Sequence, residues 1–267
     1  MASRGKRGPQ MRDPKSRFSD RAENYARYRP GYPREILSVL EERDALGGDT
    51  VVADVGSGTG ALSVLFLKNG NTVLGVEPNR EMRRAAEGLL RDHHLFESID
   101  GSAEDTTLED ESVDLVVVAN ALHWVDRDAA RAELSRILRP GGRVAVVWHV
   151  ARESGTPFLR DHADLMSAYM TGSGAGGAEG ARAMTRAFFG DVPGGQRGYE
   201  VATFPYSQGL DFEGFKGLVL SSSSVPALGQ PGSEEMLREV EEVFRGHESG
   251  GEITMEYEVS VYCGRLT

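Results

Sequence analysis

Cysteine, excess positive charge and long apolar runs are all scarce in this sequence of 267 residues. Cys263 is the single cysteine, so no disulfide can form within the chain. The formal net charge is -11, which disfavours a nucleic-acid surface because such a surface needs clustered Lys and Arg to neutralise phosphates. No apolar run approaches the roughly 18 residues that span a membrane, and the N-terminus has no hydrophobic signal segment. These absences predict a soluble, cytoplasmic protein that acts on neither a nucleic acid nor a membrane.

The pattern along the chain predicts one α/β unit with additions. Strands alternate with helices between residues 51 and 150, as in a parallel sheet. Residues 1–15 are basic, contain Gly and Pro, and have no periodic apolar side chains, so they are predicted as a disordered tail. An arm that binds nucleic acid or an anionic surface is the alternative for this tail. Residues 16–267 are then a single domain, with its core at 35–150 and a cap and terminal strands at 151–267.

A buried strand at residues 51–55 leads into a glycine turn and a helix that opens at Ala61. Gly56, Gly58 and Gly60 occupy alternate positions of the turn. Glycine permits positive φ and lets a ligand approach the backbone, and the free N–H groups at a helix start attract carboxylates and phosphates. The turn therefore predicts a site for a nucleotide-like cofactor.

The residues beside the glycines separate two kinds of cofactor. Gly56, Gly58 and Ala61 satisfy the dinucleotide pattern, so an NAD-dependent oxidoreductase is one alternative. Asp54, however, would lie poorly beside a pyrophosphate and well beside an ammonium group. With its acid-x-Gly-x-Gly-x-Gly order, the segment resembles the first motif of the class I S-adenosylmethionine-dependent methyltransferases.

Later segments extend this resemblance in order. Residues 72–77 form an expected strand that ends at Glu77, whose carboxylate can accept hydrogen bonds from ribose hydroxyls. Residues 99–105 resemble the third strand and the adenine-facing loop, and the apolar strand 113–119 leads to Asn120. A helix at 127–138, a turn at 140–142 and a strand at 143–148 follow. The resemblance implies a Rossmann-like, seven-stranded, mostly parallel, doubly wound sheet with a terminal antiparallel strand, an N-terminal helix and a cap of helices and loops.

On this basis the cofactor is S-adenosyl-L-methionine, and a set of strand-end residues is assigned to it. These residues are Asp54, Gly56, Ser57, Gly58, Gly60, Glu77, Pro78, Ala103, Glu104 and Asn120. The alternative for the two acids is that neighbouring backbone amides satisfy them. If they bind the cofactor, Asp54→Ala and Glu77→Ala should each weaken its affinity by about tenfold or more.

The N-terminal segment 18–33 resembles the aromatic helix of the trans-aconitate type of small-molecule methyltransferase, which folds over the cofactor. That resemblance alone assigns Tyr25 and Arg29 to the cofactor and Tyr28 to the substrate. Aromatic packing of the helix onto the domain is the alternative. The resemblance covers nearly the whole chain, but its strong motifs end near Trp148.

Candidate catalytic residues follow the carboxyl ends of predicted strands, where methyl delivery is expected. His123 and His149 are the candidate bases, with a structural hydrogen bond or an aromatic wall as the alternative for each. Trp124 and Trp148 are assigned to the acceptor pocket, or to the core as the alternative. His93 and His94 have no carboxylate at metal-ligand spacing, so no metal is predicted.

Residues 170–198 are rich in glycine and are predicted as a loop, either a lid or a disordered insertion. Strands are predicted at 199–207 and 252–266, and helices at 212–220 and 234–244. The sequence does not predict an oligomeric state.

The function implied is methyl transfer by in-line displacement to a small-molecule acceptor, at an oxygen of a carboxylate or hydroxyl. A carboxylate needs no base, whereas a hydroxyl does. Two further alternatives stay open: a relative that binds the cofactor with another or no catalytic activity, and a methyltransferase that acts on protein or RNA.

Overall fold

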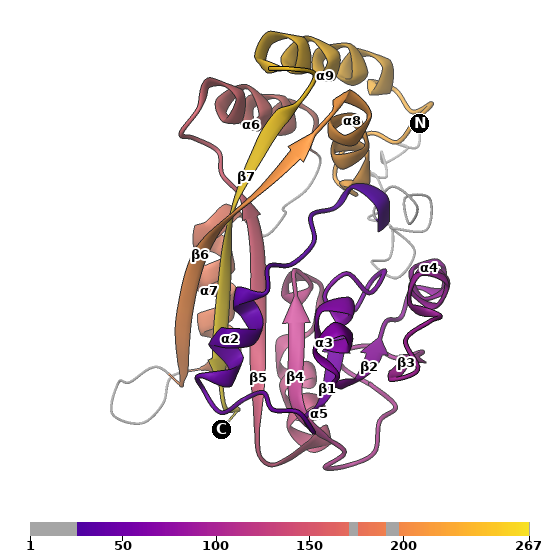
Figure 1. Ribbon diagram of the computed structural model, residues 1–267, viewed down its shortest axis with the longest axis vertical. Helices are drawn as coiled ribbons and strands as arrows, with labels where there is room; N and C mark the ends of the chain where they lie inside the picture. The colour runs from indigo at the N-terminus through magenta and orange to yellow at the C-terminus, as the bar shows by residue number, and fades with distance from the viewer. Residues whose placement is uncertain (1–25, 171–175, 191–197, 267) are drawn as a thin grey trace, which may run out of the picture.

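The computed structural model describes residues 26–170, 176–190 and 198–266, and a central sheet organises them (Figure 1). Its strands are β1 (Val51–Val55), β2 (Thr72–Val76), β3 (Phe96–Ile99), β4 (Val113–Ala119), β5 (Leu138–Ala151), β6 (Tyr199–Leu210) and β7 (Ile253–Gly264). They lie in the order β3-β2-β1-β4-β5-β7-β6. The strands β1 to β5 are parallel, and β7 is antiparallel to its neighbours β5 and β6. The predicted fold class is confirmed, with the antiparallel strand lying between β5 and the edge strand β6.

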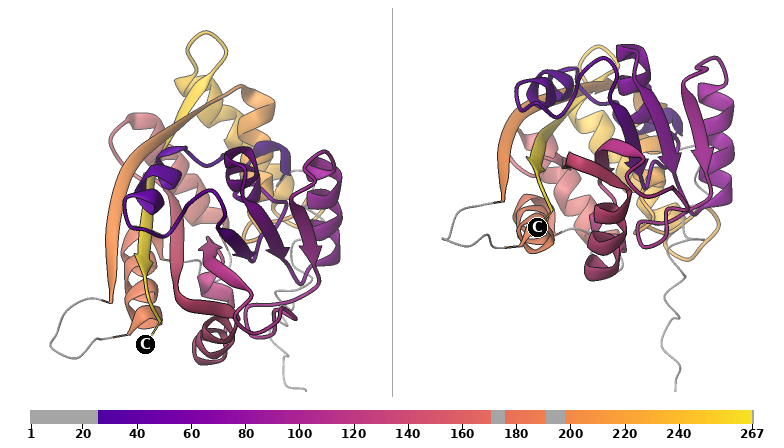
Figure 2. Two further views of the ribbon diagram at one scale, coloured as in Figure 1. Left: turned by 60° about the horizontal axis from the view of Figure 1, so that its bottom comes forward. Right: turned by 90° about the horizontal axis from the view of Figure 1, so that it is seen from below.

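Helices cover both faces of the sheet (Figure 2). On one face α2 (Glu35–Glu41) and α3 (Ser63–Asn69) pack on Leu115 and Val117 of β4, and α4 (Arg80–Leu90) adds Leu90 to the same cluster. On the other face α5 (Arg127–Ile137) and α7 (Gly177–Phe189) pack on Val116 and Val118. Alternate residues of β4 thus enter opposite cores, which explains why this strand is apolar throughout.

Three further helices form a cap beyond the carboxyl ends of the parallel strands (Figure 1). They are α6 (Pro157–Tyr169), α8 (Phe212–Ser221) and α9 (Ser233–His247). Leu159, Phe215 and Met236, one from each helix, meet in a third apolar cluster, which Met255 and Tyr257 of β7 join. The long β7 therefore connects the cap to the sheet.

Side-chain caps and glycine fix several helix ends. Asn79 accepts hydrogen bonds from the backbone N–H groups of Glu81 and Met82 at the start of α4, and Asp126 caps α5 in the same way. Gly70 ends α3 with φ of 95°. Strand β4 has the bounds predicted for it, and β6, β7, α8 and α9 end within three residues of theirs.

Two predicted boundaries near the cofactor segments are wrong. Helix α3 begins at Ser63 instead of Ala61, and residues 61 and 62 form a turn that precedes it. The third strand is Phe96–Ile99, so residues 100–105 belong to the loop that follows it. Both corrections lengthen the loops at the carboxyl edge of the sheet.

The predicted loop at 170–198 is also wrong in part, because α7 lies within it. Its Ala181, Phe188 and Phe189 are buried against the sheet, and this spacing was hidden by the glycines around it. Residues 171–175 and 191–197 lie outside the described residues.

The described N-terminal part begins with helical residues 26–28. The predicted tail at 1–15 and most of the predicted N-terminal helix lie outside the described residues. Within the described ranges, no helix has both the length and the apolar character required to cross a bilayer.

Candidate active site

The glycine loop, residues 54–60, begins in the last two residues of β1 and lies against the end of β2. Gly56, Gly58 and Gly60 have φ values of 74°, 57° and 82°, a region that other residues enter at a cost of about 1–2 kcal/mol. A Cβ on Gly56 would lie 2.7 Å from the Cβ of Ala121. The backbone N–H groups of Gly56 and Ser57 both donate to the carbonyl of Val76, at 2.8 and 3.2 Å. The predicted need for glycine at these three positions is confirmed.

Asp54 is buried beneath this loop with half of its carboxylate unpaired. Its Oδ2 accepts a hydrogen bond from Ser63 Oγ at 2.6 Å, whereas Oδ1 has no hydrogen-bond partner among the described residues. Burial raises the pKa of this carboxyl to about 6, against the lowering effect of the Ser63 bond. Such an oxygen fits a ligand that brings a positive charge or a donor.

Glu77 connects the glycine loop to the start of α4. Its Oε2 accepts from the backbone N–H of Gly58 at 3.0 Å, and its Oε1 accepts from that of Asn79 at 2.8 Å. Burial raises the pKa of this carboxyl, against these two hydrogen bonds, which lower it. Each carboxylate oxygen has a further lone pair, so the same side chain can hold the loop and still accept from a ligand hydroxyl. Pro78 follows it at the turn into the helix.

These residues fit S-adenosylmethionine by chemistry. The unpaired oxygen of Asp54 suits an ammonium group, the carboxylate of Glu77 suits ribose hydroxyls, and the glycine backbone leaves room for a ligand above the turn.

The loop after β3 contains the two residues assigned to the adenine. Ala103 is buried, and Oε1 of Glu104 accepts from the backbone N–H of Asp126 at 2.8 Å. The backbone groups of Ser102 and Asp105 pair across the loop, which places Ala103 and Glu104 at its tip.

Asn120 joins three segments at the end of β4. It has φ of 49°, its Nδ2 donates to the hydroxyl of Tyr32 at 3.1 Å, and its Oδ1 accepts from the backbone N–H of His149 at 2.9 Å. The positive φ of a non-glycine residue is unusual and often marks a functional position. Asn120 thus fixes His149 relative to the end of β4.

His149 lies in β5, with its ring among three tyrosines. The ring centroids of Tyr257, Tyr206 and Tyr32 are 4.5, 5.1 and 5.6 Å away. Burial, and after it the charge of Arg29, lowers the pKa of His149 to about 3. Its Nε2 is buried without a hydrogen-bond partner among the described residues. The imidazole is therefore neutral near pH 7 and has an unused polar atom.

His149 lines a cavity of about 190 Å³ between the sheet edge and the cap, called here the acceptor cavity. Ala61 and Asn120 line it on the side of the glycine loop and β4, and Arg29 is its one Arg or Lys; no Asp or Glu lines it within the described residues. Arg29 Nε donates to Ser221 Oγ at 2.9 Å. The rest of the lining is Pro30, Tyr32, Ala151, His162, Met166, Met170, Leu218, Val219, Ser222, Met255 and Tyr257.

The other candidates from the sequence lie away from this cavity. The His123 ring is tilted against Trp124 and stacked on Trp148, with ring centroids 4.6 and 6.0 Å away. Trp148 is buried in the core next to α7, and its Nε1 donates to Thr185 Oγ1 at 2.7 Å. Tyr28 packs on α8, where a Cβ on Gly217 would overlap its ring. Tyr25 lies outside the described residues.

Several residues that line the cavity carry no signal in the sequence. Tyr32 was inside the segment that resembled an aromatic N-terminal helix, and Tyr257 was inside a predicted strand. His162 and Met166 are four residues apart on α6, a spacing that puts them on one helix face. No local motif marks any of these four residues. Within the described ranges, no group of three His, Cys, Asp or Glu residues could hold a metal ion.

Comparison with known proteins finds similarity to methyltransferases. Residues 53–146 match the family model described as "Methyltransferase domain". The chain is 38% identical over 142 residues to the uncharacterized methyltransferase Rv3342 of Mycobacterium tuberculosis, an alignment that covers 53% of this chain and 56% of that protein. It is 26% identical to the uncharacterized methyltransferase-like protein C25B8.10 of Schizosaccharomyces pombe, over 85% and 86% of the two chains. The chain thus spans little more than half the length of the first curated relatives that it matches.

Solved structures share the fold. A putative type II methyltransferase from Anaeromyxobacter dehalogenans superposes with a TM-score of 0.67 at 23% identity, covering 90% of this chain and 98% of that one. The [4+2]-cyclase SpnF superposes with a TM-score of 0.55 at 17% identity, covering 96% of each chain.

Proposed function

Since this chain contains a class I S-adenosylmethionine-dependent methyltransferase domain, we propose that it transfers the methyl group of that cofactor to an oxygen atom of a small acceptor. The observation that carries the proposal is the acceptor cavity, which adjoins the segment after the glycine loop at Ala61 and the end of β4 at Asn120. In open α/β sheets, ligands collect at the carboxyl ends of the strands. A cavity of about 190 Å³ suits a small molecule and not a protein segment or RNA.

The residues of the glycine loop would hold the cofactor. Asp54 would receive its ammonium group, Glu77 its ribose hydroxyls, and Ala103 and Glu104 would lie beside its adenine. When bound, S-adenosylmethionine supplies a methyl group on a positively charged sulfur. The protein then has to align the acceptor and exclude water, which is the main contribution to rate expected here. The cap supports that role because its apolar side chains, such as Met166 and Leu218, line the cavity.

The polar side chains of the cavity favour a carboxylate over a hydroxyl as the acceptor. His149 has a pKa of about 3, so it is a weak base for an alcohol or phenol near pH 7. As a neutral imidazole it can instead orient an acceptor oxygen by hydrogen bonding. Arg29 supplies positive charge nearby. Because it is the one Arg or Lys in the described lining, the cavity is better suited to a monocarboxylate than to a tricarboxylate of the trans-aconitate kind.

Calorimetry followed by product analysis tests the proposal. Wild-type protein should bind S-adenosylhomocysteine and not NADH, and it should release S-adenosylhomocysteine from S-adenosylmethionine in the presence of small monocarboxylates. Met166→Trp, which fills the cavity, should abolish that release and leave cofactor binding unchanged. Leu89→Trp places the same side chain at an exposed position on α4 and is the matched control.

Other outcomes would point to the alternatives. Binding of NADH in place of S-adenosylhomocysteine would favour an oxidoreductase. Cofactor binding with no methyl transfer to any small acid or alcohol would favour another chemistry on this fold, which also occurs in a protein described as a [4+2]-cyclase. Methyl transfer to protein or RNA alone would favour a macromolecular substrate.

A further inference from the structure

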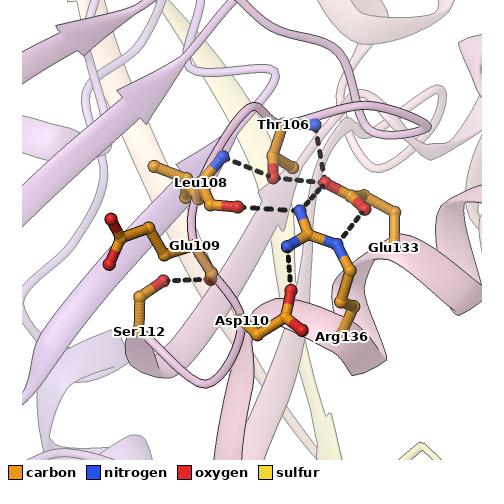
Figure 3. Close-up of polar contacts among 7 residues, drawn as sticks. All are labelled: Thr106, Leu108, Glu109, Asp110, Ser112, Glu133 and Arg136. Atoms are coloured by element: carbon orange, nitrogen blue, oxygen red, sulfur yellow. Dashed lines mark hydrogen bonds and ion pairs between the residues drawn. The ribbon is translucent and has the colours of Figure 1, made fainter.

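A polar cluster outside the acceptor cavity holds the loop after β3 (Figure 3). Oε1 of Glu133, on α5, accepts from the backbone N–H of Thr106 at 2.8 Å and from its Oγ1 at 2.5 Å. Thr106 has no exposed surface. Both donors of one buried residue thus converge on one carboxylate oxygen from another element.

Arg136 completes the cluster one turn later on the same helix. Its Nε donates to Oε2 of Glu133 at 2.8 Å and its Nη2 to Oε1 at 2.7 Å, which makes the pair bidentate. Arg136 also donates to the carbonyl of Leu108 at 2.8 Å and to Asp110 at 2.5 Å. The Arg136 hydrogen bonds, and after them those of Thr106, lower the pKa of Glu133 to about 2. The carboxylate is therefore ionised throughout the physiological range.

The residues joined in this way bracket the loop of residues 101–106. The base of the loop is held through Thr106, and its tip is held to the same helix through Glu104 and the backbone N–H of Asp126. The loop itself is tight, since a Cβ on Gly101 would lie 2.7 Å from the carbonyl oxygen of Thr106. Helix α5 is in turn fixed to the sheet through buried Ala130, Leu134 and Ile137.

We propose that Glu133 is a positioning residue for the cofactor: through Thr106 it holds the 101–106 loop in the form that receives the adenine, with Arg136 fixing its carboxylate. This inference rests on the proposed function, because it takes the loop to be the adenine side of the site. Glu133 bonds the loop at Thr106, where the loop ends. It does not bond Ala103 or Glu104, the tip residues assigned to the adenine. Its removal should therefore change the discrimination between nucleobases as well as the affinity.

Calorimetry with two ligands tests this role. S-adenosylhomocysteine and S-inosylhomocysteine differ only in the base, which has an amino group at position 6 and a bare N1 in the first and an oxo group and an N1–H in the second. Glu133→Ala should weaken binding of S-adenosylhomocysteine by about tenfold, weaken the inosyl compound less, and so reduce the preference between them. The KM for S-adenosylmethionine should rise while kcat at saturation stays within about twofold. A general loss of stability would lower both affinities together and leave their ratio unchanged.

Matched variants keep the test decisive if Glu133→Ala folds poorly. Thr106→Val keeps the shape of the side chain and removes its hydroxyl donor. It should weaken binding of S-adenosylhomocysteine by about threefold and reduce the preference over the inosyl compound in the same direction. Thr106→Ser, which keeps the donor, should have wild-type values. Glu241→Ala breaks an exposed ion pair with Arg245 on α9, at 2.5 Å, and should change neither affinity.

Wild-type affinity for both ligands in Glu133→Ala and Thr106→Val would overturn the positioning role, as would an equal loss of both ligands. Failure of the wild-type protein itself to bind S-adenosylhomocysteine would overturn the proposed function and this inference together, and it would be seen before any variant is made.

Discussion

The glycine loop and the acceptor cavity are assembled over very different distances along the chain. In the glycine loop, Asp54 bonds Ser63 and Gly58 bonds Glu77, over separations of 9 and 19 residues. Around the cavity, Tyr32 bonds Asn120 over 88 residues and Arg29 bonds Ser221 over 192. The first region depends on local backbone geometry, and the second depends on how the cap docks. A substitution in the loop should therefore remove cofactor binding, whereas one in the cavity should alter acceptor use alone.

The largest effect is expected where the loop has no room for a side chain. Gly56→Val places a β-branched residue at φ of 74° and its Cβ 2.7 Å from that of Ala121, so both backbone and neighbour must move. Affinity for S-adenosylhomocysteine should fall by about 100-fold, equivalent to about 2.7 kcal/mol. Calorimetry measures this, with Gly48→Ala as the control because a Cβ at Gly48 meets nothing within 4 Å. Near wild-type affinity in Gly56→Val would contradict the claim that cofactor binding depends on the backbone of the glycine loop.

Asp54→Asn should separate binding from stability. Folding raises the pKa of Asp54 from 3.8 to about 6. The free energy of unfolding therefore falls as the pH rises through that window, because the unfolded chain loses the proton first. At pH 8 the folded protein holds a buried charge. Removing the charge should raise the melting temperature at pH 8, and that gain should shrink at pH 4. Affinity for S-adenosylhomocysteine should fall by about tenfold. Scanning calorimetry at both pH values and a binding titration check this, and a lower melting temperature at pH 8 with unchanged binding would contradict it.

The same contrast explains what the sequence could predict. The strand ends, the three left-handed glycines and the position of Glu77 follow from short segments whose backbone leaves few alternatives. Trp148 and His149 are adjacent in one strand and face opposite sides of the sheet, so only the packing of α7 and of the tyrosines decides that His149 lines the cavity and Trp148 the core. The residues of α6 that line the cavity carry no local signal, because their role comes from where the cap lies.

On the cavity side, His149 should affect turnover more than cofactor affinity. His149→Phe keeps an aromatic ring among the tyrosines but removes Nε2, so kcat should fall by about tenfold, with affinity for S-adenosylhomocysteine within about twofold of wild type. Folding lowers the pKa of His149 from 6.5 to about 3, so wild-type stability is lost as the pH falls from 6.5 towards 3, where the unfolded chain takes up the proton. The variant should therefore lose less stability than wild type between pH 7 and pH 5. Exposed His94→Phe is the control, and an unchanged kcat in His149→Phe would remove His149 from the acceptor site.

The smallest effect on function is expected at Trp148, whose neighbour in the strand has the opposite surroundings. Trp148→Phe loses the hydrogen bond to Thr185 and part of a buried ring, so the free energy of unfolding should fall by about 1–3 kcal/mol. Thr185→Val removes the other partner of that bond, and in the double variant the two losses should be less than additive because the bond is removed only once. Denaturant titrations measure these energies, and steady-state kinetics with a monocarboxylate acceptor should give an unchanged KM. A raised acceptor KM in Trp148→Phe, with no change in Thr185→Val, would instead place the indole at the acceptor and extend the cavity through the sheet edge towards α7.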